Sequence, residues 1–276
     1  MLYMLPWFPS ALLLSPRVWA LVRRAVFLPT LLLALLLLPL GFVSSAAAQG
    51  SSHDEERDRA RPLSPVVVDD FETYRPGTFP GNWTFVRKSG ETLSYEESNE
   101  PGEEIVVRSE NGNQFVRVTV RNEAIRYSQR NGKEFDWSIN ELPRLKWRWR
   151  AHHLPEGASE KGENDTGAAL YVTFGSDWLG RPKSIKYTYS SSLPVGTVVS
   201  FGPLKVIVVD SKREPGLGEW KTIQRNVVDD YHQVFGGDPP DRPLSITFWS
   251  DSDTTGDYAK VDFDDIQLLP PYRRAN

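Results

Sequence analysis

LKWRWRA, Leu145 to Ala151, decides the fold class of this chain. Apolar and basic side chains alternate through the stretch, and successive side chains of a β-strand point to opposite faces. The apolar face holds Leu145, Trp147, Trp149 and Ala151, and the basic face holds Lys146, Arg148 and Arg150. A period of two therefore predicts a strand with one face in a core.

Other runs with this period follow one another along the chain, separated by turn residues. They lie at residues 66–72, 80–86, 104–109, 114–120, 169–175, 184–190, 204–210, 244–250 and 259–269. Asn111-Gly112 predicts a hairpin between two of them. About ten strands without regular crossovers predict an all-β domain, an antiparallel β-sandwich of the jelly-roll type.

One segment has a helical period instead. In NVVDDYHQVFGG, Asn226 to Gly237, Asn226 is an N-cap residue and the apolar side chains from Val227 to Phe235 recur at helical spacing. Gly236 and Gly237 end the pattern. We expect one short amphipathic helix that packs against the sandwich.

The beginning of the chain is predicted to be a signal peptide, residues 1–48. Arg17, Arg23 and Arg24 precede an apolar run from Ala25 to Val43, and small residues predict cleavage after Ala48. The run is also long enough for an uncleaved anchor. A charged tether at 49–65, a single domain at 66–270 and a tail at 271–276 complete the expected organisation. We therefore expect a periplasmic or secreted bacterial protein with no stable membrane span after cleavage.

The charge balance excludes one class of partner. The chain has 32 Lys plus Arg and 36 Asp plus Glu; three of the bases precede residue 49, which leaves 29 against 36, a net charge of about −7. Sequence-independent binding of nucleic acid requires the opposite sign. The chain has no Cys, so it has neither a thiol nucleophile nor a disulfide.

Five residues are candidates for ligand binding. Arg148 and Arg150 form the basic row of the strand quoted above, and three further side chains point away from the apolar faces of their strands: Tyr171, Lys186 and Trp249. If these groups share one face, they would bind a polysaccharide or envelope glycan, above all an anionic one. In the alternative interpretation the tryptophans are core residues and the bases form a solvated face.

Carboxylates gather in the first and last predicted strands, in VVVDDFE and VDFDDIQLL. Those strands commonly lie side by side in a jelly roll, and adjacent carboxylates raise one another's pKa. Calcium takes six to eight oxygen ligands, so we predict a structural calcium ion held by Asp70, Glu72, Asp264 and Asp265. The alternative is that the acids protect an edge strand. Because Phe263 and Ile266 fall on opposite faces, we also expect a bulge at Asp264 and Asp265.

Two further stretches are rich in oxygen ligands, SDSDTTGD at Ser250 to Asp257 and GENDTGA at Gly162 to Ala168. Both could be simple turns, since the first lacks the residue placement of an EF-hand loop.

No catalytic motif is present, and no catalytic residue is predicted. The sequence has no GxSxG and no HExxH. A polysaccharide lyase site could still form from Arg148, His152 and Tyr171, and a hydrolase needs two carboxyl groups that sequence cannot pair. A scaffold that contacts other envelope proteins is the third class.

Several stretches in this order resemble one family. VVDDFE, LKWRWRA, ENDTGAALYVTF, KSIKYTYSSSLPVGTV, RNVVDDYHQVFG and SDSDTTGDYAKVDFDDI are similar to bacterial secreted proteins of domain of unknown function family 3047. That resemblance implies export and gives no catalytic residue. DDFE and DFDDI also resemble the terminal strands of jelly-roll carbohydrate-binding modules, which bind a structural calcium there. The sequence therefore favours an exported, non-catalytic protein that binds a carbohydrate or another cell-envelope ligand.

Overall fold

The computed structural model describes residues 63–86, 91–99, 102–162 and 165–272, all of which lie in one compact unit, 59–276. The expected signal peptide and most of the expected tether lie outside the described residues. Within the described part, no helix has the length and apolar character that a membrane crossing needs.

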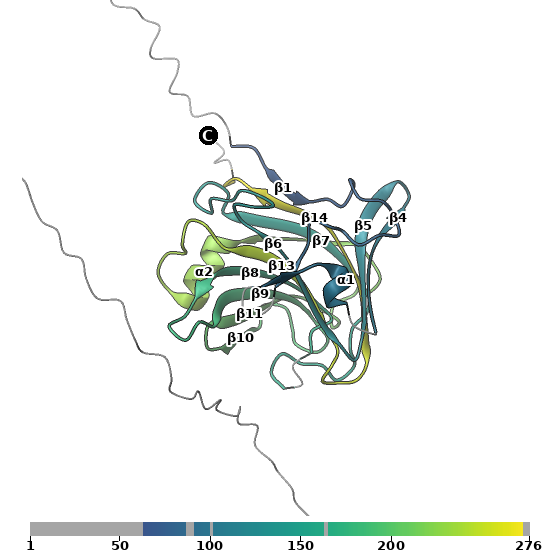
Figure 1. The fold of residues 1–276 in the computed structure, drawn as a ribbon. Helices are drawn as coiled ribbons and strands as arrows, with labels where there is room; N and C mark the ends of the chain where they lie inside the picture. The colour runs from purple at the N-terminus through teal and green to yellow at the C-terminus, as the bar shows by residue number, and fades with distance from the viewer. Residues whose placement is uncertain (1–62, 87–90, 100–101, 163–164, 273–276) are drawn as a thin grey trace, which may run out of the picture. The chain divides into compact units, whose positions relative to one another are not determined.

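Two six-stranded sheets form a sandwich (Figure 1). Sheet A has the order β12-β7-β14-β5-β4, with β1 paired to β14; the bounds are β1 Val66–Asp69, β4 Glu103–Glu110, β5 Asn113–Arg121, β7 Arg144–His153, β12 Lys221–Asn226 and β14 Tyr258–Leu269. Sheet B has the order β10-β11-β9-β8-β13-β6; the bounds are β6 Ala124–Arg130, β8 Ala168–Ser176, β9 Pro182–Ser190, β10 Val198–Phe201, β11 Leu204–Ser211 and β13 Ser245–Asp251. The predicted all-β sandwich is confirmed.

Three smaller elements complete the described fold: the paired strands β2 (Phe85–Val86) and β3 (Thr92–Leu93), the single-turn helix α1 (Tyr95–Ser98) and the helix α2 (Val227–Phe235). Asn226 caps α2 by accepting from the backbone N–H groups of Val228 and Asp229, as the sequence predicts. The helix α1 was not predicted, although Ser94 and Glu97 form a capping box there.

Aromatic side chains fill the space between the sheets. Trp147 and Trp149 of β7 are fully buried, with ring centroids 5.3 Å apart. From sheet B, Tyr187 lies 5.6 Å from Trp147 and Tyr189 lies 5.6 Å from Trp149. Burial of large aromatic surface is the main favourable term for such a core, so the apolar face of LKWRWRA joins the two sheets.

Several local predictions are confirmed. Asn111 and Gly112 both have positive φ (53° and 82°) in the turn between β4 and β5. The first and last strands pair, with Val66 opposite Leu268. The pairing of β14 with β7 shifts register between Asp264 and Gln267, where Asp265 has a φ of 50°.

One strand pair departs from the antiparallel expectation. The strands β9 and β11 run parallel, with Ser184 opposite Leu204. The strand β10 lies between them in the chain and pairs antiparallel with β11. It therefore occupies the end of sheet B, beyond β11.

Candidate functional site

The outer face of sheet B brings together four side chains from four neighbouring strands, Arg126 on β6, Trp249 on β13, Tyr171 on β8 and Lys186 on β9. The register places Trp249 opposite Arg126 and Tyr171 opposite Lys186. Since Leu170 is buried in the core, the next side chain, Tyr171, points away from it. We call these four residues the sheet B cluster.

The cluster is built around an aromatic pair. The rings of Tyr171 and Trp249 are 5.4 Å apart at 38°, and both side chains are half-buried. The ammonium of Lys186 lies 5.5 Å from the Tyr171 ring and 5.7 Å from the Trp249 ring. The guanidinium of Arg126 lies 5.9 Å from the Trp249 ring. Two cations therefore flank the pair at cation–π distance.

Burial affects both of these cations. Lys186 is 4% exposed, and its ammonium donates to the Thr166 hydroxyl at 2.9 Å. Burial lowers the pKa of Lys186 to about 8, against the attraction of Asp251. The Arg126 Nε is buried without a hydrogen-bond partner, and burial also lowers the pKa of Arg126. The Lys186 ammonium has three N–H donors, one of which bonds to Thr166, and this leaves donors for a polar ligand.

Three carboxylates lie at the end of the same face. Oxygens of Asp165, Asp251 and Asp253 all lie within 4.8 Å of one another, and we call them the three-carboxylate group. Burial, followed by the charge of Asp253, raises the pKa of Asp251 to about 7. Asp251 also accepts a long 3.4 Å hydrogen bond from the Trp249 indole, so the group is continuous with the sheet B cluster.

The backbone around Asp165 fixes that group. Asp165 accepts from the backbone N–H groups of Thr254 (3.0 Å) and Thr255 (2.7 Å) and from the Thr255 hydroxyl (2.6 Å). Burial acts in the other direction, but these bonds lower the pKa of Asp165 and keep it ionised. The three-carboxylate group has the oxygen ligands that calcium prefers. Lys186 lies beside the group, and its positive charge balances part of the negative charge of the carboxylates.

Sheet A holds the other predicted binding residues on its own outer face. Arg148 pairs with Asp264 and with Asp265, the latter at 2.9 Å, and Arg150 pairs with Asp262 at 2.9 Å. The Trp220 ring lies 5.1 Å from the Arg148 guanidinium and 4.7 Å from that of Arg150. The basic row is thus neutralised and covered, and it lies on a different sheet from Tyr171, Lys186 and Trp249.

Asp262 is the centre of a charged network on sheet A. Its carboxylate is fully buried and accepts from Arg117 at 2.7 and 2.9 Å, from Arg150 and from His152 at 2.8 Å. Burial opposes ionisation, but the bonds from Arg117 and His152 lower the pKa of Asp262. His152 and Arg148 belong to sheet A and Tyr171 to sheet B, so these three residues do not form one lyase site.

The acids predicted to hold calcium have protein partners. Asp264 and Asp265 contact Arg148, as described above. Asp70 accepts from the Glu72 backbone at 3.2 Å, and Glu72 accepts from the Gln114 backbone at 2.8 Å. Among the described residues, the acids that converge tightly enough for a metal are the three-carboxylate group instead.

That group comes from the two oxygen-rich stretches noted in the sequence. Asp165 lies in GENDTGA, and Asp251 and Asp253 lie in SDSDTTGD. Sequence reasoning did not join them, since the contact spans more than eighty residues. It also missed Arg126, although Ile125 and Tyr127 alternate with that base and signal a strand.

Comparisons with known proteins come from the sequence and from the fold. No curated protein matches the sequence. The fold is similar to the family 11 carbohydrate-binding module of the cellulosomal cellulase Lic26A-Cel5E of Clostridium thermocellum (11% identity, TM-score 0.39, 76% of this chain and 96% of that chain). It is also similar to the family 30 module of the cellulase Cel9D-Cel44B of the same organism (12%, 0.40, 76% and 100%) and to the exolytic PL7 alginate lyase AlyA5 of Zobellia galactanivorans (12%, 0.38, 71% and 99%).

The family model described as protein of unknown function (DUF3047) matches residues 89–267, which is well over half of the chain. The match spans the strands from β3 through most of β14. It also includes the sheet B cluster and the three-carboxylate group. The chain belongs to the DUF3047 family.

Proposed function

We propose that this protein is an exported, non-catalytic carbohydrate-binding protein whose ligand lies on the outer face of sheet B. The observation that supports this proposal is the Tyr171–Trp249 pair with Lys186 and Arg126 beside it. Export rests on the signal pattern before Ala48.

The chemistry of the sheet B cluster suits a sugar ring. The C–H face of a pyranose is apolar and packs on an aromatic ring, which removes both surfaces from water. Its hydroxyl groups both donate and accept hydrogen bonds. Lys186 and Arg126 supply donors, and Asp251 supplies an acceptor next to the Trp249 indole. An aromatic surface with a few placed polar groups is the usual composition of a ligand site.

The scaffold holds these groups in place. Each of the four residues of the cluster lies on a strand of sheet B, with its neighbours along the strand in the core. Sites on strands are more precisely positioned than sites on loops. The ligand therefore meets an aromatic surface that is already formed.

The test is binding of the purified protein to xylan, a β-glucan and polygalacturonate, measured by calorimetry. We expect saturable binding to at least one of the two neutral polymers and, for that polymer, a loss of about tenfold in affinity for Trp249→Ala, since an aromatic contact contributes about 0.5–1.5 kcal/mol beyond the area it buries and about 1.4 kcal/mol corresponds to tenfold. Trp178→Ala is the matched control, because Trp178 is 88% exposed on the turn between β8 and β9. Equal affinities of the wild type and Trp249→Ala would refute the site.

A polysaccharide-active enzyme is the second candidate, and one observation favours it. The pKa of Lys186 is lowered and that of Asp251 is raised, so both are shifted toward the range of acid–base catalysts. Incubation with the same three polymers, followed by chain-length analysis, separates the two functions. Unchanged chain length supports a binding protein, and shortened chains that Lys186→Met abolishes support an enzyme.

A bound calcium ion is a further part of the proposal. The three-carboxylate group offers three anionic ligands, and calcium needs additional oxygens from backbone or solvent. We expect calcium to raise the melting temperature of the wild type and not that of Asp165→Asn. The site proposed from the sequence, with Asp264 and Asp265, is tested in the same way by Asp265→Asn.

A further inference from the structure

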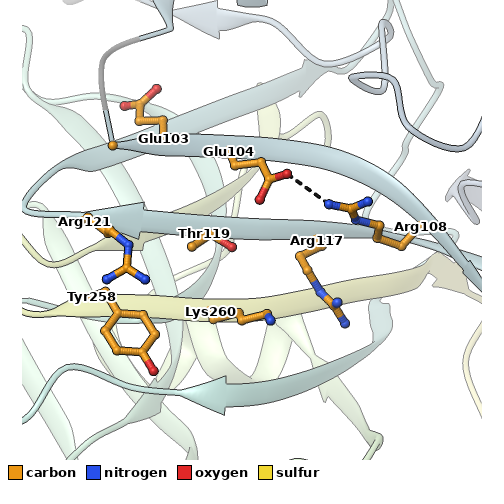
Figure 2. Close-up of a pocket in the computed structure, with 9 residues that line it drawn as sticks. Glu103, Glu104, Arg108, Arg117, Thr119, Arg121, Tyr258 and Lys260 are labelled. Atoms are coloured by element: carbon orange, nitrogen blue, oxygen red, sulfur yellow. Dashed lines mark hydrogen bonds and ion pairs between the residues drawn. The ribbon is translucent and has the colours of Figure 1, made fainter.

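The outer face of sheet A contains a pocket that is separate from the sheet B cluster. Its cavity volume is about 400 Å³, within the range of small-ligand sites. Figure 2 shows its lining side chains projecting from three neighbouring strands, β4, β5 and β14. Four of them are cations, Arg108, Arg117, Arg121 and Lys260, and two are acids, Glu103 and Glu104.

Two of these cations already have acid partners. Arg108 pairs with Glu104 at 2.9 Å, as the dashed line in Figure 2 marks. Arg117 pairs with the buried Asp262 at 2.7 Å. For Arg121 and Lys260, in contrast, the described part of the chain offers no carboxylate within ion-pair distance.

The register places the two unpaired cations on neighbouring strands of the same face, two residue positions apart. Tyr258 lies opposite Arg121, and Lys260 lies opposite Thr119, on the next residue pair of the same face. Thr119 thus lies on β5 between Arg121 and Arg117, opposite Lys260, whose ammonium points toward Arg117 (Figure 2). Glycine is required at one end of the pocket, because a Cβ on Gly102 would lie 2.7 Å from the Arg121 carbonyl oxygen.

Stacking holds Arg121 in position. Its guanidinium lies 4.6 Å from the centroid of the Tyr258 ring. His153 stacks on the same ring at 3.8 Å with an interplanar angle of 5°, and His153 is in turn held by Asp257 at 3.0 Å. A guanidinium held in this way loses less conformational freedom on binding and presents its paired N–H donors to an oxyanion.

From this geometry we infer that the pocket on sheet A is a binding site for an oxyanion group, such as the carboxylate of an acidic sugar. Arg121 binds the group with two N–H donors, and Lys260 and Thr119 bind it from the side. A planar carboxylate matches the donor pair of arginine, and a tetrahedral sulfate or phosphate group is also anionic and can accept the same donor pair through two of its oxygens. This inference concerns other residues than the proposed function and does not depend on it.

The test uses oligogalacturonate, glucose 6-phosphate and neutral xylohexaose as probes in calorimetry at low salt. We expect oligogalacturonate to bind and Arg121→Gln and Lys260→Gln each to weaken it at least about fivefold, since a hydrogen bond to a charged group contributes more than 1 kcal/mol. Added salt weakens the binding further. Arg213→Gln, which removes an exposed positive charge from the loop after β11, keeps the wild-type affinity.

The outcomes separate the sources of the anion. Binding of oligogalacturonate alone assigns the site to acidic sugars, and binding of glucose 6-phosphate with the same dependence on Arg121 assigns it to phosphate esters. Trp249→Ala leaves either of them unchanged, so failure of the sheet B site does not remove this one. The inference is overturned if neither anionic probe binds, or if Arg121→Gln and Lys260→Gln bind both probes as the wild type does.

Discussion

Replacement of Asp69 by alanine tests how the first strand is attached to the sandwich. The Asp69 carboxylate accepts four hydrogen bonds: from the Phe71 backbone (2.8 Å), the Tyr74 hydroxyl (2.7 Å), the Trp83 indole (2.8 Å) and the Gln129 amide (3.0 Å). Trp83 and Gln129 are each 1% exposed, so their donors have no access to water. Asp69 thus joins β1, the segment before β2 and β6.

The cost follows from the donors left unpaired. A buried donor without a partner costs about 1–3 kcal/mol, and Asp69→Ala strands two of them fully and two in part. We expect a loss of about 4 kcal/mol, to which Tyr74 adds nothing because its side chain is half-buried and its hydroxyl can turn to solvent. Burial raises the pKa of Asp69, because desolvation of the carboxylate costs more than its hydrogen bonds return. The expected loss of stability is therefore smaller than the sum of the four hydrogen-bond energies.

Urea unfolding followed by fluorescence measures this loss. For a slope of about 2.5 kcal/mol per molar urea, the midpoint falls by roughly 1.5 M. Asp70→Ala is the matched control, since Asp70 accepts one exposed bond from Glu72, and we expect a change below about 0.5 kcal/mol. Asp69→Asn retains the volume and separates lost bonds from a cavity. A loss below about 1 kcal/mol for Asp69→Ala, or one equal to that of Asp70→Ala, would refute the reasoning.

Three further predictions concern other buried groups. Asp262→Asn lowers the free energy of unfolding by about 3–5 kcal/mol at pH 7. The folded state lowers the pKa of Asp262, so its stabilisation is lost on protonation and the difference from the wild type shrinks as the pH falls below 3.8. Urea unfolding at a series of pH values measures this difference. Gly167→Ala lowers the free energy of unfolding by about 1–3 kcal/mol, and with it the melting temperature, since its Cβ would lie 2.7 Å from the Leu154 side chain and 2.8 Å from the Pro155 ring. In the presence of a chelator, we expect tryptophan fluorescence to change with a midpoint near pH 7, because Asp251, which accepts from the Trp249 indole, changes its charge there. Asp251→Asn abolishes this transition.

Each of these has a control and a contradicting result. For Asp262, a stability difference that stays constant between pH 7 and pH 3 contradicts the assigned pKa direction. Gly175→Ala is the partner of Gly167→Ala, because its Cβ meets nothing within 4 Å, and equal melting temperatures of the two variants contradict the steric argument. Asp253→Asn keeps the fluorescence transition and moves it to lower pH, since Asp253 raises the pKa of Asp251; a transition that survives in Asp251→Asn assigns it to another group.

The fold was predictable where local patterns are strong. Alternation identified LKWRWRA as a strand with a core face, and the Asn-Gly step and the Asn226 cap identified a hairpin and a helix. The parallel pairing of β9 with β11 has no local signal, because it depends on where the chain returns after β10. Strand periodicity specifies which side chains share a face of one strand and says nothing of neighbouring strands.

The same limit explains the candidate site. The sequence grouped Tyr171, Lys186 and Trp249 as outward-pointing residues, and they do meet on sheet B. Arg148 and Arg150 point outward equally well, but their strand belongs to sheet A. Their charge is neutralised by carboxylates on β14 that the register places opposite, as with Asp264 and Arg148.

The three-carboxylate group shows a second limit. Its members were visible as acidic turn residues, yet Asp165 reaches Asp251 only through the pairing of β8 with β13. A contact between distant segments follows from sheet order, which one sequence does not specify. Asp264 and Asp265 could be identified from the sequence equally well as clustered acids, but in the structure both pair with Arg148.

The indole N–H signal of Trp249, observed by NMR on protein labelled with ¹⁵N-tryptophan, tests the central claim most directly. The protein is titrated with the neutral probes xylohexaose and cellohexaose in turn, and Trp249→Phe assigns the signal. We expect a binding oligosaccharide to shift the Trp249 signal saturably, while the signal of Trp178 on its exposed turn stays in place. Saturable binding of any of these probes with an unmoved Trp249 signal would contradict a carbohydrate site on the outer face of sheet B.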